Sequence, residues 1–155
     1  MLHIALYEPD IPQNTGTLLR LGACMNVGIH VIEPCGFPFS IKALRRSAMD
    51  YVDHVEIYHH DDFDAFHDWV QAENKRLVLL TTKGATSLPE FSFSPDDILL
   101  LGRESAGVPD HVHDSAQARV VIPMAKGMRS LNVALAGSMV LAEALRQTDG
   151  YPPLA

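Results

Sequence analysis

The apolar positions of this chain gather in short runs that have the length of buried β-strands. The runs cover residues 2–7, 28–33, 76–81, 98–101 and 120–122, and each lies between turn residues or segments with helical spacing. Short continuous apolar runs are typical of parallel strands that are covered by helices on both sides. We therefore predict an α/β fold, a mostly parallel sheet with helices on both faces.

Three further segments have the spacing of helices. Asn14 is expected to cap a helix over residues 15–26. Residues 61–73 place aromatic and aliphatic side chains at helical intervals, with carboxylates in the first turn, where the helix dipole favours them. Residues 132–147 are apolar on nearly every side of their first turns, so this helix should be buried in the core or against another subunit.

The composition fits one globular domain. The chain has 155 residues, 47% of them hydrophobic and 20% charged. No apolar run approaches the roughly 20 residues that cross a bilayer, so no membrane segment is expected. Cys24 and Cys35 are too few for a disulfide scaffold and lack metal-ligand spacing, which indicates a reduced, cytoplasmic protein.

The net charge of -7 is unevenly distributed. Residues 50–73 hold eight acidic residues and no lysine or arginine, whereas the rest of the chain has all 12 basic residues against 11 acidic ones. The overall charge therefore does not exclude a nucleic-acid partner, and the acidic segment is expected to face away from it.

Three polar loops follow predicted strands directly, at the positions where open α/β sheets bind ligands. The first, residues 8–16, reads E-P-D-I-P-Q-N-T-G. Asn14 at a helix cap would leave free N–H groups, and Gly16 would let a phosphate or another backbone come close. Arg20 follows within the same helix, from where its long side chain can reach back over the helix start. From spacing alone, a capped helix with a surface arginine is the simpler alternative.

The second and third loops combine glycine or proline with charged residues. Residues 99–109 read L-L-L-G-R-E-S-A-G-V-P, in which backbone amides near Gly102 could hold a flat ligand and Glu104 could bind a cation or pair with an arginine. Residues 122–132 read I-P-M-A-K-G-M-R-S-L-N and join a buried strand to a buried helix. Either Ser130 or Asn132 can cap that helix. An ordinary turn with an exposed ion pair and a plain surface loop are the alternatives.

Several other chemistries lack their patterns. The chain contains no GxGxxG or GxxxxGK[ST] phosphate loop and no GxSxG nucleophile elbow. Its eight histidines come without HExxH or CxxC, so no metal site is expected. Lys42, Arg45 and Arg46 lie on one short helical stretch, which is either a solvated face or a set of phosphate contacts.

Together, the three loops resemble the three motifs of the SpoU branch of the SPOUT RNA methyltransferases. The matching segments are N-T-G-T-L-L-R at 14–20, L-L-L-G-R-E-S-A-G-V-P at 99–109, and I-P-M with R-S-L-N-V-A-L-A at 122–136. Each segment alone is weak evidence for the resemblance, but the three together are strong evidence. Further matches at 6–16, 32–37, 44–46, 80–84 and 150–152 extend the resemblance over essentially the whole chain.

The short chain, with no added RNA-binding domain, is similar to the minimal TrmL group, whose members are tRNA (cytidine/uridine) 2′-O-ribose methyltransferases acting at the wobble nucleotide. The resemblance implies a single SPOUT domain over residues 1–155, with a C-terminal trefoil knot in an α/β sheet; such knots are rare exceptions among folds. It implies S-adenosyl-L-methionine as the cofactor, tRNA as the partner, and a homodimer in which two subunits build each active site. The apolar segment 132–147 suits such a dimer.

The resemblance also implies roles for individual residues. Arg20 would be the catalytic arginine near the target ribose, while Asn14, Glu104 and Asn132 would fix the loops and the geometry of the site. Four residues would line the cofactor pocket: Leu80, Gly102, Ile122 and Ser130. Apart from the resemblance, we expect six cations to join Arg20 in contacting RNA: Lys42, Arg45, Arg46, Lys83, Lys126 and Arg129.

Methyl transfer to a ribose 2′-hydroxyl asks the protein mainly to align the hydroxyl and help it lose a proton, because the cofactor supplies the activated carbon. Arginine is effectively never deprotonated in proteins, so we expect Arg20 to orient the hydroxyl and stabilise developing negative charge. A transient base role for Arg20, and proton loss to phosphate or water, stay open.

Two other functions stay open at this stage. The same chemistry could act on rRNA or on another tRNA position, although the lack of an RNA-binding extension argues against it. A cofactor- or RNA-binding module without catalysis is the other alternative. The motif residues argue against that second alternative: Asn14, Arg20, Glu104, Ser130 and Asn132.

Overall fold

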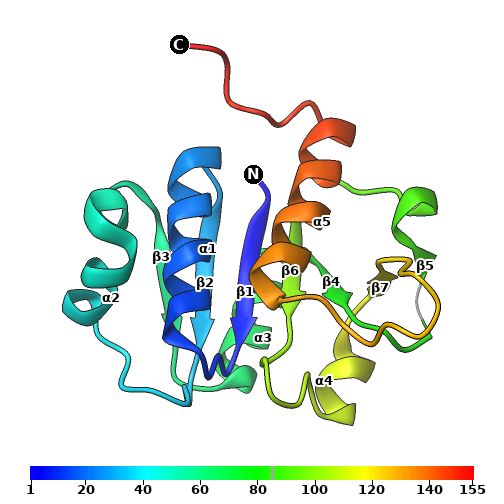
Figure 1. Ribbon diagram of the computed structural model, residues 1–155, viewed down its shortest axis with the longest axis horizontal. Helices are drawn as coiled ribbons and strands as arrows, with labels where there is room; N and C mark the ends of the chain where they lie inside the picture. Colours follow the sequence, from blue (N-terminus) through cyan, green and yellow to red (C-terminus); the bar gives the residue numbers. More distant parts are fainter. Residues whose placement is uncertain (85) are drawn as a thin grey trace.

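A computed structural model describes residues 1–84 and 86–155, except for the side chains of residues 47–49. In the described chain, seven strands form one sheet in the order β3-β2-β1-β6-β4-β7-β5, and all their pairings are parallel (Figure 1). The strands are β1 (His3–Tyr7), β2 (Gly28–Ile32), β3 (Ile57–His60), β4 (Arg76–Leu80), β5 (Thr86–Ser87), β6 (Asp97–Leu101) and β7 (Ala118–Val121).

Helices cover both faces of this sheet, as the apolar runs predicted. They are α1 (Pro12–Met25), α2 (Ile41–Ala48), α3 (Phe63–Ala72), α4 (Asp110–Ser115) and α5 (Val133–Gln147), with two short 3-10 helices, η1 (Met49–His54) and η2 (Leu88–Glu90). One core cluster joins the sheet to α1, α5 and the α2–η1 segment, and a second joins it to α3 and α4. Successive residues of the central strands alternate between the two clusters: Leu99 and Leu101 face α5, whereas Ile98 and Leu100 face the other way.

The five predicted strands are confirmed, with ends shifted by one or two residues. The prediction missed β3, β5 and α4. The strand β3 reads I-Y-H-H, and its histidines conceal a strand that lies at the edge of the sheet. The strand β5 has only two residues, Thr86 and Ser87, too few to leave a pattern.

The predicted first helix was wrong at its start. The helix α1 begins at Pro12, whose fixed φ suits the first helical position, and Ile11 occupies the N-cap position. Asn14 therefore lies inside the first turn, and its side chain is free to point elsewhere. The other two helices are confirmed: Asp62 caps α3, and Asn132 caps α5 by accepting the N–H groups of Ala134 and Leu135.

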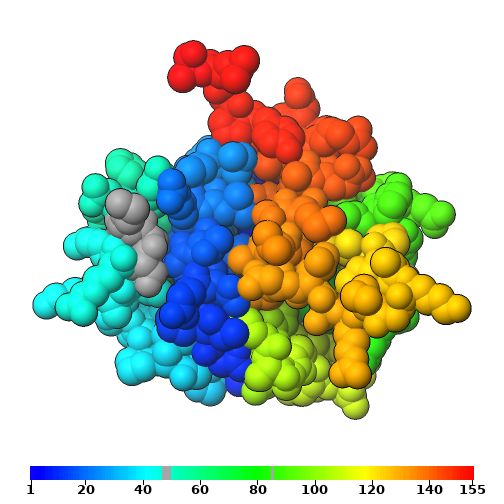
Figure 2. Space-filling model, in the orientation of Figure 1, coloured from blue at the N-terminus to red at the C-terminus, as the bar shows by residue number. Residues whose placement is uncertain are grey.

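The helix α5 packs closely on the middle of the sheet and on α1, which lies beside it in Figures 1 and 2. Gly137 makes this approach feasible, because a Cβ there would lie 2.9 Å from a methyl group of Leu101 and 3.3 Å from one of Leu18. The chain therefore returns from β7, near one edge of the sheet, to its centre. Beyond α5, the C-terminal residues project from the body of the protein (Figure 2).

Three buried histidines lie in a row on the α3 face of the sheet. His3 of β1, His30 of β2 and His60 of β3 are joined by ring-nitrogen contacts of 2.8 Å (His3 Nδ1 to His30 Nε2) and 2.9 Å (His30 Nδ1 to His60 Nε2). The rings of Tyr58 and Trp69 flank His30 at centroid distances of 4.4 and 4.6 Å. Burial lowers the pKa of His3 to about 4 and that of His30 to about 2, so the row is neutral at pH 7.

Candidate active site

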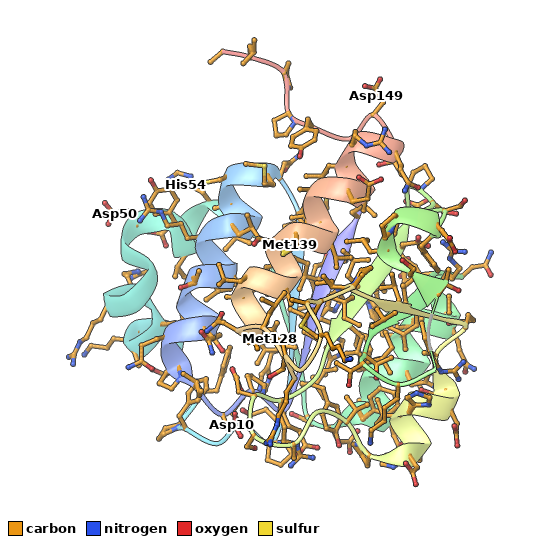
Figure 3. The ribbon with its side chains drawn as sticks, turned by 45° about the vertical axis from the view of Figure 1, so that its right-hand side comes forward. Asp10, Asp50, His54, Met128, Met139 and Asp149 are labelled. Carbon is orange, nitrogen blue, oxygen red and sulfur yellow. The ribbon has the colours of Figure 1, made fainter. Side chains whose placement is uncertain are left out.

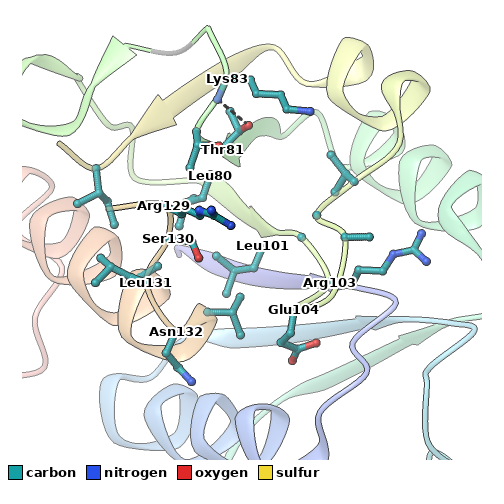
Figure 4. A pocket seen from close by; sticks show the side chains of 18 of the residues that line it. Leu80, Thr81, Lys83, Leu101, Arg103, Glu104, Arg129, Ser130, Leu131 and Asn132 are labelled. Carbon is teal, nitrogen blue, oxygen red and sulfur yellow. Dashed lines mark hydrogen bonds between the residues drawn. The ribbon is translucent and has the colours of Figure 1, made fainter. Parts of the chain in front are cut away.

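A cavity of about 590 Å³ opens at the carboxyl ends of β4, β6 and β7, beside the start of α5 (Figure 4). Its walls come from the ends of these strands, from the 102–108 turn, and from the loop that leads into α5. Aliphatic side chains line the interior: Leu80, Leu101, Val120, Ile122 and Val133. Apolar walls of this kind, with polar groups at the rim, are typical of sites for small organic ligands.

A tight turn forms one wall of the cavity. Arg103 and Gly107 exchange two backbone hydrogen bonds of 3.0 and 2.9 Å, and Gly107 has a φ of 63°, which favours glycine. A Cβ on Gly102 would lie 2.8 Å from the Cα of Gly107. Gly102 is thus required by the turn itself, because a side chain there would displace backbone that lines the cavity.

Hydrogen bonds join the three predicted loops at the rim of this cavity. Asn132 Nδ2 donates to Asn14 Oδ1 at 3.1 Å, and Asn14 Nδ2 donates to Glu104 Oε1 at 3.4 Å. The other oxygen of Glu104, Oε2, accepts the backbone N–H of Asp10 at 2.9 Å. Asn132 also caps α5 through its own oxygen, at 2.8 Å from Ala134 N. The start of α5 is therefore coupled to the loop after β1 and to the loop after β6.

The acids in this network have opposite pKa shifts. Burial, followed by the neighbouring Asp10 carboxylate, raises the pKa of Glu104. The pKa of Asp10 is lowered, first by its hydrogen-bonding interaction with Glu104 and then by the hydroxyl of Ser105, which donates to the Asp10 carboxylate. The negative charge at this rim is therefore held more firmly on Asp10 than on Glu104.

The structure brings most of the predicted site residues together. Around the cavity lie the four predicted cofactor residues, three predicted polar residues and two predicted cations: Leu80, Gly102, Ile122, Ser130, Asn14, Glu104, Asn132, Lys83 and Arg129. In Figure 4, Ser130 and Arg129 lie on one side of the cavity and Glu104 on the other, and Lys83 lies at its far rim.

Arg20 does not line this cavity. It is exposed on α1, and its guanidinium carbon lies 4.6 Å from the ring centroid of Tyr51, on the side of α1 that packs against η1. Lys42, Arg45 and Arg46 are exposed on α2, outside the cavity, and Lys126 is exposed on the loop before α5. Arg45 pairs with Asp53 of η1 at 2.7 Å. The beginning of the acidic segment 50–73 thus lies against the predicted RNA-contacting cations, so it is not separated from them.

Sequence reasoning missed two residues at or near the site. Asp10 supplies an N–H to Glu104, although nothing in E-P-D-I-P-Q-N distinguishes it from an ordinary loop acid. Arg103, which also lines the cavity, lies 3.5 Å from Glu8 and over the ring of Tyr7. The signal for a role of Arg103 is its place beside Glu104 in the second loop, although its ion pair in the structure is with Glu8.

In the part of the chain that the structure describes, no group of three or more histidine, cysteine or acidic side chains is placed to hold a metal ion. Within the same residues, no helix has both the length and the apolar character that crossing a membrane requires.

The chain that forms this site is similar in sequence to a known protein family. The sequence pattern of the SpoU rRNA Methylase family matches residues 1–142. This chain belongs to the SpoU methylase family. The prediction from the three loops is thereby confirmed, and the SpoU motifs correspond to the segments that meet at the cavity.

Relatives within the SpoU family match over almost the full chain. A tRNA (cytidine(34)-2′-O)-methyltransferase of Ancylobacter novellus is 57% identical over 150 residues, which are 97% of this chain and 95% of the relative. A solved structure that gives insights into the 2-OH methylation of C/U34 on tRNA superimposes with a TM-score of 0.88 at 39% identity, covering 95% of each chain. An AdoMet-bound rRNA methyltransferase of Sinorhizobium meliloti has a TM-score of 0.84 at 29% identity, over 94% of this chain and 56% of that one.

Proposed function

We propose that this SpoU-family protein transfers a methyl group from S-adenosyl-L-methionine to the ribose 2′-hydroxyl of nucleotide 34, cytidine or uridine, in tRNA. The observation that carries the proposal is the meeting of all three motif loops, through Asn14, Glu104 and Asn132, at the rim of one cavity. The relative from A. novellus, 57% identical, is named a tRNA (cytidine(34)-2′-O)-methyltransferase, and the solved structure at 39% identity concerns 2-OH methylation of C/U34 on tRNA. The match covers 95% of that relative, so the same substrate is the simplest assignment for this chain.

The cavity residues fit the cofactor. A volume of about 590 Å³ lies within the range of roughly 300–1,000 Å³ that drug-sized and nucleoside-like ligands occupy. Leu80 and Ile122 offer apolar contact for an adenine ring, and the 102–107 turn offers backbone groups. Ser130 adds a hydroxyl, and Arg129 and Lys83 add positive charge for a carboxylate. The bound cofactor supplies the activated methyl carbon.

The chain's own contribution is orientation and charge. Asn14, Glu104 and Asn132 hold the start of α1, the turn after β6 and the start of α5 in one arrangement, so the wall of the pocket is fixed before a ligand enters. The guanidinium of Arg20 orients the 2′-hydroxyl and stabilises negative charge as the proton leaves. Arg20 cannot be the base while it stays protonated, so phosphate or water takes the proton.

Arg20 is absent from the lining of the pocket in the same chain, and this supports a homodimer in which one subunit supplies Arg20 to the other's pocket. An apolar surface beside the pocket suits such an interface. On α5, Leu135 is 59% and Met139 is 45% exposed, and Met128, in the loop before it, is 67% exposed (Figure 3). Leaving these side chains in water is unfavourable, whereas a second copy would bury them. Sedimentation with cofactor should therefore show a species heavier than the 17.0 kDa monomer.

We further propose a single SPOUT domain over residues 1–155 with a C-terminal trefoil knot. Support comes from the path of the chain, which leaves β7 near the edge of the sheet and returns to place α5 over β6 and against α1. The proposal also includes a cytoplasmic location, where tRNA is modified. It includes RNA contacts from the exposed cations of α2 and of the loops around the pocket: Lys42, Arg45, Arg46, Lys83, Lys126 and Arg129.

The test is an in-vitro methylation assay with labelled cofactor and total tRNA, followed by mapping of the modified nucleotide. We expect a 2′-O-methyl group at nucleotide 34 of particular tRNAs and none on purified rRNA. Label at another tRNA position, or on rRNA, would show that the protein is a 2′-O-methyltransferase with a different substrate. Binding of cofactor and tRNA without any transfer would support the non-catalytic module and overturn the proposal.

A further inference from the structure

We propose that Tyr51 is a positioning residue for Arg20: its ring holds the guanidinium in the orientation that the reaction requires, without using any of its hydrogen-bond donors. The proposal rests on the proposed function, because it assigns Arg20 to the target ribose. It deepens that function by naming the group that prepares the arginine on its own subunit.

The contact itself is a stacking of the guanidinium on the aromatic ring. Arg20 projects from α1, Tyr51 belongs to η1, and the guanidinium carbon lies 4.6 Å from the ring centroid. That distance is well inside the roughly 6 Å over which a cation is attracted to an aromatic face. Within the described chain, Arg20 makes no ion pair and its guanidinium makes no hydrogen bond, which leaves the Tyr51 ring as the group placed to orient it.

A ring is a better support than a carboxylate for an arginine that must act on RNA. A carboxylate would occupy the donors on the edge of the guanidinium and would repel a nearby phosphate. A ring contacts the flat face and leaves all five N–H donors on the edge free for a hydroxyl and a phosphate. Asp53, two residues after Tyr51, does not compete, because it is paired with Arg45 at 2.7 Å.

The residues next to Tyr51 anchor the η1 segment to the rest of the protein. The next residue, Val52, is buried in the core cluster that also holds Leu44 of α2. The Arg45–Asp53 pair also joins α2 to η1, two residues after Tyr51. Figure 3 shows Asp50 and His54, which flank this stretch, on the η1 segment beside α1. Tyr51 is itself half-buried, and the two residues after it tie η1 to α2, so the ring can restrict a long side chain that is otherwise exposed.

The phenol oxygen is not needed for this role. Among the residues that the structure describes, the Tyr51 hydroxyl makes no hydrogen bond. Phenylalanine should therefore support Arg20 as well as tyrosine does, whereas leucine, which is similarly apolar but has no π face, should not. This contrast separates positioning by the ring from a general effect of packing.

The experiment is a double-mutant cycle on the methylation of tRNA by the full-length protein. Tyr51→Leu should lower kcat by roughly five- to thirtyfold, the range expected for losing a partly desolvated cation–π contact, while KM and cofactor affinity change by less than about twofold. Tyr51→Phe should stay within about threefold of the wild type. In an Arg20→Ala background, Tyr51→Leu should have no further effect, because no cation is left for the ring to hold. Thermal melts of each variant check folding, and Tyr51→Met replaces the leucine variant if that one melts early.

Equal losses from Tyr51→Leu in both backgrounds, or a loss in Tyr51→Phe as large as in Tyr51→Leu, would overturn the proposal and leave the proposed function intact. An NMR measurement tests the Arg20–Tyr51 contact independently of enzymatic activity. The Arg20 side-chain resonances, assigned with Arg20→Lys, should show a ring-current shift in the wild type and in Tyr51→Phe and lose it in Tyr51→Leu. A wild type that methylates no RNA would overturn the proposed function, and with it the reaction role of Tyr51. The ring-current shift would then report only whether the contact exists.

Discussion

On the α3 face of the sheet, His3, His30 and His60 form a buried row in which the ring nitrogens of neighbouring imidazoles are in hydrogen-bond contact. Aromatic rings pack around this row. At the carboxyl ends of β4, β6 and β7, polar groups instead surround a cavity of about 590 Å³. Both regions place polar side chains on a mostly apolar sheet. In the first they are satisfied internally and stabilise the fold, and in the second they are left facing a space that a ligand can fill.

The comparison predicts that the two regions fail in different ways. The largest effect should come from His30→Leu, which leaves His3 Nδ1 and His60 Nε2 without partners in the core. The free energy of unfolding should fall by about 2–5 kcal/mol, measured by urea denaturation, since each unsatisfied buried group costs about 1–3 kcal/mol. His54→Leu, at an exposed position of η1, is the matched control and should change little. An equally stable His30→Leu protein would show that the row does not stabilise the fold.

The pocket region should show the opposite behaviour. Arg20→Lys keeps the charge and loses the planar fork, so the methylation rate should fall at least about a hundredfold while the melting temperature and cofactor affinity stay unchanged. Raising the pH should not restore the rate, because geometry is missing rather than a proton acceptor. Recovery at alkaline pH in a single titration step would instead support a base at position 20.

Acid should destabilise the protein through the histidine row. The unfolded chain takes up protons below the ordinary histidine pKa of 6.5, whereas burial keeps His3 neutral down to about 4 and His30 to about 2. Stability is therefore full above pH 6.5 and is lost as the pH falls below it, by up to about 1.4 kcal/mol per histidine at pH 5.5. Urea midpoints at pH 7.5 and 5.5 measure this loss. His54→Gln should show the same pH dependence as the wild type, and a flat wild-type profile would contradict the buried, neutral row.

A smaller effect is expected from the turn beside the cavity. Gly102→Ala places a Cβ 2.8 Å from Gly107 Cα, so the turn must shift, at a cost of about 1–3 kcal/mol shared between stability and cofactor binding. Calorimetry should show S-adenosyl-L-methionine affinity weaker by a few-fold to about a hundredfold, since 1.4 kcal/mol is a factor of ten. An unchanged affinity would mean that the cofactor does not use this wall.

The smallest effect concerns the exposed cations. Removing one phosphate contact should reduce the log–log salt dependence of tRNA binding by about 0.7, the value for single-stranded nucleic acid. Arg46→Ala should show this reduction, whereas Arg146→Ala, which removes an arginine paired with Glu143 on α5, should not. Equal slopes for wild type and Arg46→Ala would exclude α2 from the RNA-binding surface.

The two regions also differ in how far the sequence predicts them. The pocket loops were found because glycine, proline and charged residues follow apolar runs directly, and because their motifs match a family. The histidine row was not found, since His3, His30 and His60 are far apart in the chain and become neighbours only through the register of β1, β2 and β3. Pro12 likewise moved the start of α1 ahead of Asn14, and this freed the asparagine to bond Glu104. The place of Arg20 depends on packing between α1 and η1, which no local pattern encodes.

The Asn14–Asn132 and Asp10–Glu104 hydrogen bonds have a consequence for how the protein folds. They join residues 118 and 94 positions apart in the sequence, and so the rim of the pocket exists only after the chain has brought its most distant segments together. Contacts of such long range form slowly, because the entropy of closing large loops must be overcome first. During refolding, circular dichroism should therefore recover before the ability to bind S-adenosyl-L-methionine does. In a cell, a partly folded chain of this kind would carry helices and strands but would consume no cofactor.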